Sequence, residues 1–249
     1  MAARKFMLTQ NSQLRKIGVF NFTLPAWVVT LPDGRSINVC PSASACIKLC
    51  YARSGAYRFS NVLAAHMRTL AFVMDHPDEW EAAMIEELSH KRYDGKSVRI
   101  HDSGEFFSDD YLLRWMRIME ESPGVHFYTY TKEVGMFRQH VEPHPPANFR
   151  WRYSLGGKQD HLLDLTSDRH AEVLPDEDAV AKGGFVSNTP SDLVAASAAI
   201  KVGMPANNIR HLQKLQGQRT FGEIQREMDE VRRRRLERAR VKARFRLAT

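Results

Sequence analysis

The feature that most constrains the fold is a repeated alternation of short apolar strands with helical stretches in the middle of the chain. Strands are predicted at residues 97–101, 126–130 and 149–154, with helices at about 109–121 and from Glu133. Strands separated by helical segments of about 10–20 residues are typical of βα units, which place successive strands parallel in one sheet. The sequence therefore predicts an α/β protein with a mostly parallel sheet.

The flanking regions add further elements to this pattern. A hairpin is predicted around the turn Pro32-Asp33-Gly34, since strand-forming residues lie on both sides of it. Further elements are expected on either side, namely helices at about 61–75, 77–91, from Gln159, at 191–202 and at 220–245, and a strand at 183–186. A total of about five or six strands favours a partial (βα) barrel or an open sheet over a complete eight-stranded barrel.

Three cysteines, Cys40, Cys46 and Cys50, are the only ones in the chain, and they lie within eleven residues. They follow the second strand of the predicted hairpin, with the spacing C-x5-C-x3-C among small residues. Clustered thiols in a reducing compartment more often serve metal binding or catalysis than disulfide formation. Three thiolates on one loop can hold three corners of a cubane iron–sulfur cluster and leave the fourth iron open to a small molecule.

Two other interpretations of the cysteines stay open. A structural zinc site normally takes four protein ligands, so zinc would need a further residue such as His66 or His101. The thiols could also carry no metal at all.

Polar residues follow the strands at 97–101 and 126–130. The first strand is followed by Asp102, Ser103, Gly104 and Glu105, and the second leads into Lys132. Ligands of parallel α/β proteins gather at the carboxyl ends of the strands, so these side chains are predicted to line a site. Alternatively, Asp102 and Ser103 form a turn before the next helix, Glu105 faces water and Lys132 is a surface lysine.

Three stretches together resemble a known family. CPSASACIKLCYARSGAY, RIHDSGEFFSDDYLLRW and VHFYTYTK resemble the phage and actinobacterial gene product 88 family, over roughly residues 35–155. More loosely, they resemble phage proteins of the radical S-adenosylmethionine type, whose cluster loop likewise ends in Cys-Tyr-Ala. The resemblance implies a partial (βα) barrel of that type, with the cluster loop after the first barrel strand.

The same resemblance implies an activity and a set of roles. S-adenosylmethionine would chelate the open iron of a 4Fe-4S cluster and be cleaved reductively, which requires an electron donor as partner. Gly104 and Glu105 match the stretch that contacts the methionine amino group, and Ser103 lies beside them. Tyr51 would cover the cluster or the adenine. Asp102, Glu105 and Lys132 are the expected catalytic residues, Lys132 as a partner for a carboxylate or phosphate or for Glu105.

The charge of the chain is concentrated at its end. The formal net charge is +7, but residues 231–249 hold nine basic residues and one acidic residue, which leaves residues 1–230 close to neutral. We therefore divide the chain into a barrel domain, 1–219, and a basic helix, 220–249. Nine cations on one helix would attract a nucleic-acid backbone without base specificity, although the alternative is a solvated terminus. The nine are Arg232, Arg233, Arg234, Arg235, Arg238, Arg240, Lys242, Arg244 and Arg246.

Two further functions stay open beside the radical reaction. Asp102-Ser103-Gly104, Gly156-Gly157 and the run 189–193 resemble stretches of the tRNA-guanine transglycosylase family, in which Asp102 would act as acid, base or nucleophile in base exchange. The third is a non-catalytic iron–sulfur or zinc protein that binds nucleic acid. The sequence shows neither a signal peptide nor an 18-residue apolar stretch, so we expect a cytoplasmic protein, in a bacterium or a phage-infected cell, without membrane contact.

Overall fold

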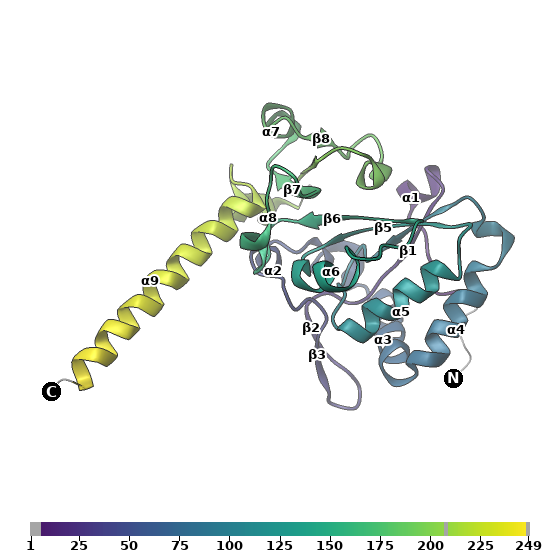
Figure 1. The fold of residues 1–249 in the computed structure, drawn as a ribbon, viewed down its shortest axis with the longest axis horizontal. Helices are drawn as coiled ribbons and strands as arrows, with labels where there is room; N and C mark the ends of the chain where they lie inside the picture. The colour runs from purple at the N-terminus through teal and green to yellow at the C-terminus, as the bar shows by residue number, and fades with distance from the viewer. Residues whose placement is uncertain (1–5, 207–208, 248–249) are drawn as a thin grey trace.

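The computed structural model describes residues 6–206 and 209–247, and its central feature is one sheet of seven strands (Figure 1). The strand order is β1-β4-β5-β6-β7-β9-β8, and every neighbouring pair is parallel. The structure confirms the predicted α/β partial barrel, since this sheet is a parallel half-barrel followed by a long C-terminal helix. The strands are β1 Val19–Phe22, β4 Ser97–Ile100, β5 His126–Thr131, β6 Phe149–Ser154, β7 His170–Leu174, β8 Val186–Ser187 and β9 Lys201–Pro205.

The predicted hairpin is present and lies outside this sheet. Strands β2 (Val28–Thr30) and β3 (Ser36–Asn38) pair antiparallel as a separate two-stranded ribbon, which projects from the body in Figure 1. The first strand of the main sheet is instead β1, which sequence reasoning did not detect. The order of elements along the chain is therefore β1, the hairpin and then the cysteine loop.

Helices cover both faces of the sheet, and one face carries more of them than the other. The outer face packs against α3, α4, α5 and α6, which form the large core with Phe22, Ile100 and Phe149. The inner face carries the short α1 and the 3-10 helix η5. The helices are α1 Ser12–Lys16, α2 Ala45–Lys48, α3 Ser60–Asp75, α4 Pro77–Leu88, α5 Asp109–Glu120, α6 Val134–His140, α7 Glu177–Lys182, α8 Arg210–Gln216 and α9 Phe221–Leu247, with 3-10 helices η1 Tyr51–Arg53, η2 Gly55–Arg58, η3 Lys91–Tyr93, η4 Asp160–Leu162 and η5 Asp192–Ala196.

Helix α5 shows how the sequence produces the outer layer. Ser108 caps it by accepting a hydrogen bond from the backbone N–H of Tyr111 at 3.3 Å, and two aspartates in its first turn favour the positive end of the helix dipole. Tyr111, Trp115 and Ile118 recur at helical spacing and are fully buried or nearly so. This helix matches its predicted bounds to within one residue.

Two predicted helices are wrong. The stretch from Gln159 forms only the single 3-10 turn η4, because the Asp160 carboxylate accepts hydrogen bonds from the N–H groups of Gly156 and Gly157 and bends the chain back. The alanine-rich run 191–202 is η5 followed by the start of β9, which pairs with β7 over five residues. Within the described residues, no helix is both long and apolar enough to cross a membrane.

His101 lies in the aromatic core of the outer face. Its ring packs against Phe106 and shares a 2.9 Å hydrogen bond through Nε2 with the hydroxyl of Tyr111. Burial lowers the pKa of His101 to about 3, so the imidazole is neutral in the folded protein. This position gives His101 a packing role.

Because His101 is buried in its neutral form, we expect the folded protein to lose stability in mild acid. The unfolded chain takes up the histidine proton below pH 6.5 and the folded chain does not, so stability falls as the pH decreases from 6.5 toward 3. The contribution is about 1.4 kcal/mol per pH unit. Chemical denaturation between pH 7 and 4.5 should show a shallower pH dependence for His101→Gln than for the parent. The exposed His161→Gln serves as control, and equal slopes for His101→Gln and the parent would contradict this assignment.

Candidate functional site

The cysteine loop runs from the end of β3 to η1. Cys40 opens it, Cys46 lies in α2, and Cys50 directly precedes η1. All three are free thiols and partly buried. Burial raises the pKa of Cys50 to about 11, with a further contribution from the nearby Cys46, and burial likewise raises the pKa of Cys40. The three sulfur atoms lie close enough for their thiolates to repel one another, so a bound proton or cation would stabilise the group.

The loop is fastened to the carboxyl ends of β5 and β6. Ser42 donates hydrogen bonds to the carboxylate of Glu133 from its backbone N–H at 2.9 Å and from its hydroxyl at 2.7 Å. The backbone oxygen of Ser42 also accepts a hydrogen bond from the backbone N–H of Lys158, which follows β6, at 2.7 Å. A bridge between Ala43 and Gly157 completes the attachment. The cysteines are therefore held at the sheet edge where ligands of parallel α/β proteins gather.

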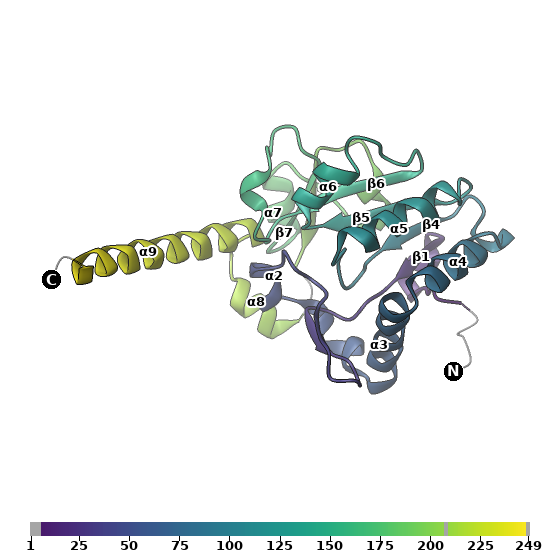
Figure 2. The same cartoon turned by 60° about the horizontal axis from the view of Figure 1, so that its bottom comes forward.

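The long C-terminal helix begins against the same loop. Its Gln225, 1% exposed, accepts a hydrogen bond at 3.0 Å from the backbone N–H of Ala45, the first residue of α2. Phe221 and Ile224 pack with Ala45 and Leu49, and Cys46 borders this cluster. From this anchor α9 extends away from the body, as both views show (Figures 1 and 2).

Glu105 lies beneath the loop and is buried. Its carboxylate accepts hydrogen bonds from the Thr131 hydroxyl at 2.9 Å and from the backbone N–H of Lys132 at 2.8 Å. Burial and the neighbouring Glu133 carboxylate together raise the pKa of Glu105 to about 7. Of the predicted polar residues after β4 and β5, Glu105 and the backbone of Lys132 come together, and Glu105 binds the end of β5 instead of facing water.

Gly104 shapes this turn. Its φ is +87°, and a Cβ there would come within 2.6 Å of the Leu24 Cβ, so a side chain would meet both backbone strain and a clash. The backbone oxygen of the preceding Ser103 accepts a hydrogen bond from the Leu24 N–H at 3.0 Å. Ser103 Oγ is buried without a hydrogen-bond partner in the described part of the chain. An orphaned hydroxyl at this edge is a candidate contact for a ligand.

Lys132 and Asp102 point in different directions from this edge. The ammonium of Lys132 donates to the Ser154 hydroxyl on β6 at 2.7 Å. Asp102 receives hydrogen bonds at its carboxylate from Thr23 and, at 3.0 Å, from Tyr57, while Tyr51 donates to its backbone oxygen. Tyr51 therefore lies over the end of β4, beside the expected cofactor-binding residues.

Sequence reasoning missed several residues of this site. Glu133 follows Lys132 directly, and its position after a strand was the available signal. Tyr57, Gln225 and Asp160 join the site through contacts from distant segments, which no local pattern reveals. Within the described residues, no three His, Cys, Asp or Glu side chains converge on a point that could hold a single metal ion. A cubane binds each thiolate to a different iron, so it does not require such a point.

The basic residues of α9 form a separate region. Arg232, Arg233, Arg238 and Arg240 are exposed, and Arg234 pairs with Glu230 one turn earlier. The predicted contacts Arg244 and Arg246 lie outside the described side chains. Cationic side chains thus continue along the projecting helix beyond its anchor.

The fold and the site together define a class of protein. It is a parallel α/β half-barrel with a three-cysteine loop at the carboxyl edge of its sheet and a cationic helix anchored on that loop. The family model described as Gene product 88 matches residues 3–242, and the chain belongs to this family.

Two curated relatives come from mycobacteriophages. The Gene 88 protein of Mycobacterium phage L5 is 29% identical over 112 residues, and that of Mycobacterium phage D29 is 32% identical over 114 residues. Each match covers 42% of this chain and 46% of the relative, so the chain spans about half the length of the curated relatives it matches. No solved structure matches the chain.

Proposed function

We propose that this protein is a radical-S-adenosylmethionine-like iron–sulfur enzyme that modifies nucleic acid or a nucleotide-derived substrate in a phage or bacterial context. The observation that carries the proposal is the loop of three free thiols at the carboxyl edge of a parallel half-barrel. Three cysteine ligands leave one iron of a 4Fe-4S cluster available to a second ligand.

The residues at this edge fit such a cofactor pair. Cys40, Cys46 and Cys50 would hold the cluster, since they are unpaired and lie on one loop. The unpartnered hydroxyl of Ser103 lies in the turn to which the resemblance assigns the methionine end of S-adenosylmethionine. When bound, the cluster would supply the electron for reductive cleavage of S-adenosylmethionine.

The chain's own groups would position this chemistry. Ser42 and Glu133 fix the cysteine loop against β5, and Glu105 ties the end of β4 to the same strand. Lys132 holds β6 through Ser154, and its charge lies near Glu105, Glu133 and Cys50. Tyr51 covers the end of β4. These contacts pre-organise the edge, which reduces the cost of ordering it when ligands bind.

The partners follow from the same arrangement. An electron donor must reach the cysteine loop, and a nucleic acid would be attracted to the exposed cations of α9. In this proposal residues 1–219 carry the chemistry and residues 220–249 carry the binding. Because Gln225 joins α9 to the loop, a nucleic acid that follows this helix back toward the body would reach the site.

Anaerobic purification tests the proposal directly. The full chain should be brown and contain iron and acid-labile sulfide, and with dithionite and S-adenosylmethionine it should release 5′-deoxyadenosine. A colourless protein without iron after anaerobic reconstitution would refute the cluster. An iron-loaded protein that never yields 5′-deoxyadenosine would refute the radical reaction and favour a binding protein.

A further inference from the structure

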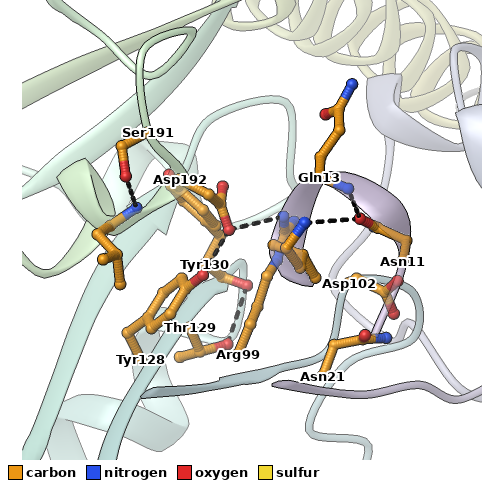
Figure 3. Close-up of polar contacts among 12 residues, drawn as sticks. Asn11, Gln13, Asn21, Arg99, Asp102, Tyr128, Thr129, Tyr130, Ser191 and Asp192 are labelled. Carbon is orange, nitrogen blue, oxygen red and sulfur yellow. Dashed lines mark hydrogen bonds and ion pairs between the residues drawn. The ribbon is translucent and has the colours of Figure 1, made fainter. Parts of the chain in front are cut away.

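A row of polar side chains crosses the inner face of the half-barrel, one layer below the cysteine loop. Asn21, Arg99 and Tyr128 are direct register partners on β1, β4 and β5, so they point to the same face. Figure 3 shows Arg99 between Asn21 and Tyr128, with Asp192 approaching from η5. None of these residues belongs to the site described above.

Arg99 is incompletely satisfied. Its Nη1 donates to Oδ2 of Asp192 at 3.1 Å, and Tyr128 donates to the same oxygen at 2.5 Å. Its guanidinium also lies 5.3 Å from the centre of the Tyr130 ring. The Nε of Arg99 and the Oδ1 of Asn21, a residue only 4% exposed, are buried with no hydrogen-bond partner in the described part of the chain. Buried polar groups normally find partners, so these two atoms are candidate contacts for a ligand.

Two arginines of the inner face, Arg99 and Arg152, donate hydrogen bonds to one segment, residues 191–200, which we call the strap. Besides Asp192, it supplies backbone oxygens to Arg152, which donates to Ser197 at 2.9 Å and to Ala199 at 2.6 Å. Arg152 also donates to the backbone oxygen of Val194 at 3.3 Å, so it fixes the backbone of the strap from Val194 to Ala199. Asp192 contacts Arg99 and Tyr128 through its side chain, so its carboxylate can turn away while Arg152 keeps its bonds.

We propose that Arg99 and Tyr128 form a binding site for a phosphate group of the substrate, and that Asp192 occupies this site until the substrate displaces it. A guanidinium offers Nε and Nη as a fork that matches two oxygens of one phosphate, and the Tyr128 hydroxyl reaches a third. Asp192 presents a single oxygen to both donors and leaves Nε empty. Phosphate also fits the proposed nucleic-acid partner, because the exposed arginines of α9 would attract polyanions.

This inference rests on the proposed function for the reaction that follows, but not for the binding step. Arg99 lies close to Tyr51, which directly follows Cys50, so a substrate held by its phosphate would lie beside the end of the cysteine loop. The carboxylate of Asp102 lies near Arg99, and its oxygens already accept hydrogen bonds from Thr23 and Tyr57, which limits its competition for the guanidinium.

Calorimetric titration of the cluster-free full chain with inorganic phosphate tests the site. Asp192→Asn removes the competing charge and should bind phosphate about tenfold more tightly than the parent, because an internal occupant lowers the apparent affinity by the fraction of free site. Arg99→Gln should abolish binding, and Arg99→Lys should weaken it. Asp110→Asn, which breaks an exposed ion pair with Arg114 on the outer face, should leave phosphate binding unchanged.

The same experiment contains the results that would overturn the proposal. Parent and Asp192→Asn proteins of equal phosphate affinity would show that Asp192 does not compete for the site. Phosphate binding that survives Arg99→Gln would place the phosphate elsewhere, for example on the arginines of α9. Acetate binding as tight as phosphate would assign the site to carboxylates instead. In the parent, phosphate should also speed hydrogen exchange at the backbone N–H of Leu193, which is bonded to Ser191. Because the protein carries no cluster here, a failure of the radical proposal leaves these results unaffected.

Discussion

Alanine at any one of Cys40, Cys46 or Cys50 is expected to remove essentially all iron from the anaerobically purified protein. A cubane that already has one iron without a protein ligand cannot stay bound through two thiolates. Iron and sulfide should therefore fall from about four atoms each per chain to near zero. The measurement is iron and acid-labile sulfide per chain after identical anaerobic reconstitution of parent and variants.

The control for this prediction lies on the same loop. Ser44 precedes α2 and makes no side-chain capping bond, so Ser44→Ala changes the loop sequence without removing a ligand or a cap. It should keep the full iron content. Iron retained by one of the cysteine variants would remove that cysteine from the ligand set. Zinc in place of iron in the parent, lost in the same variants, would instead favour the zinc interpretation.

Prediction from sequence succeeded where the residues that stabilise an element lie within that element. The helix at Asp109–Glu120 has a serine cap, acidic residues in its first turn and an apolar stripe, and all three signals are local. The strands at 97–100 and 126–131 are short runs rich in β-branched and aromatic residues between turns. Convergence of Glu105 and Lys132 followed from a general rule, because the carboxyl ends of parallel strands meet at one edge.

The errors arose where tertiary contacts decide. The alanines at 195–199 favour a helix, yet residues 192–196 form only a 3-10 helix, and the end of the predicted helix at 201–202 belongs to β9, which pairs with β7 over five residues. Strand β7 itself was missed, since His170 and Glu172 interrupt its apolar pattern and are nevertheless buried. Glu172 accepts a hydrogen bond from the N–H of Gly222 in α9, 50 residues away, and no local pattern encodes such a contact.

The same distinction applies to the inner face. Arg99 and Tyr128 were assigned to strands correctly, but their partner Asp192 was placed in a helix that does not form. Register brings Arg99 beside Asn21, and the bend after residue 190 brings Asp192 to them. Sequence reasoning cannot find a site made from one sheet and one strap, because the contact between them depends on the tertiary fold.

Replacing Arg232, Arg233, Arg238 and Arg240 by glutamine is expected to weaken the binding of duplex DNA strongly and without regard to its sequence. Each phosphate contact releases about 0.9 counterions, so four contacts change the slope of log affinity against log salt by about 3.6. These arginines are exposed on α9 beyond its anchor, so their replacement should leave the packing of Phe221 and Gln225 intact. Fluorescence anisotropy from low to moderate salt measures both affinity and slope.

The matched control removes the same charge from the body. Arg58, Arg68, Lys91 and Lys182 are exposed cations away from α9, and their replacement by glutamine lowers the net charge equally. If DNA binding depends on the helix, this control should keep most of the affinity and nearly the whole salt slope. Equal losses in both variants would mean that only total charge matters. An unchanged slope in the α9 variant would contradict the assignment of this helix as the nucleic-acid contact, and would leave the arginines as a solvated terminus.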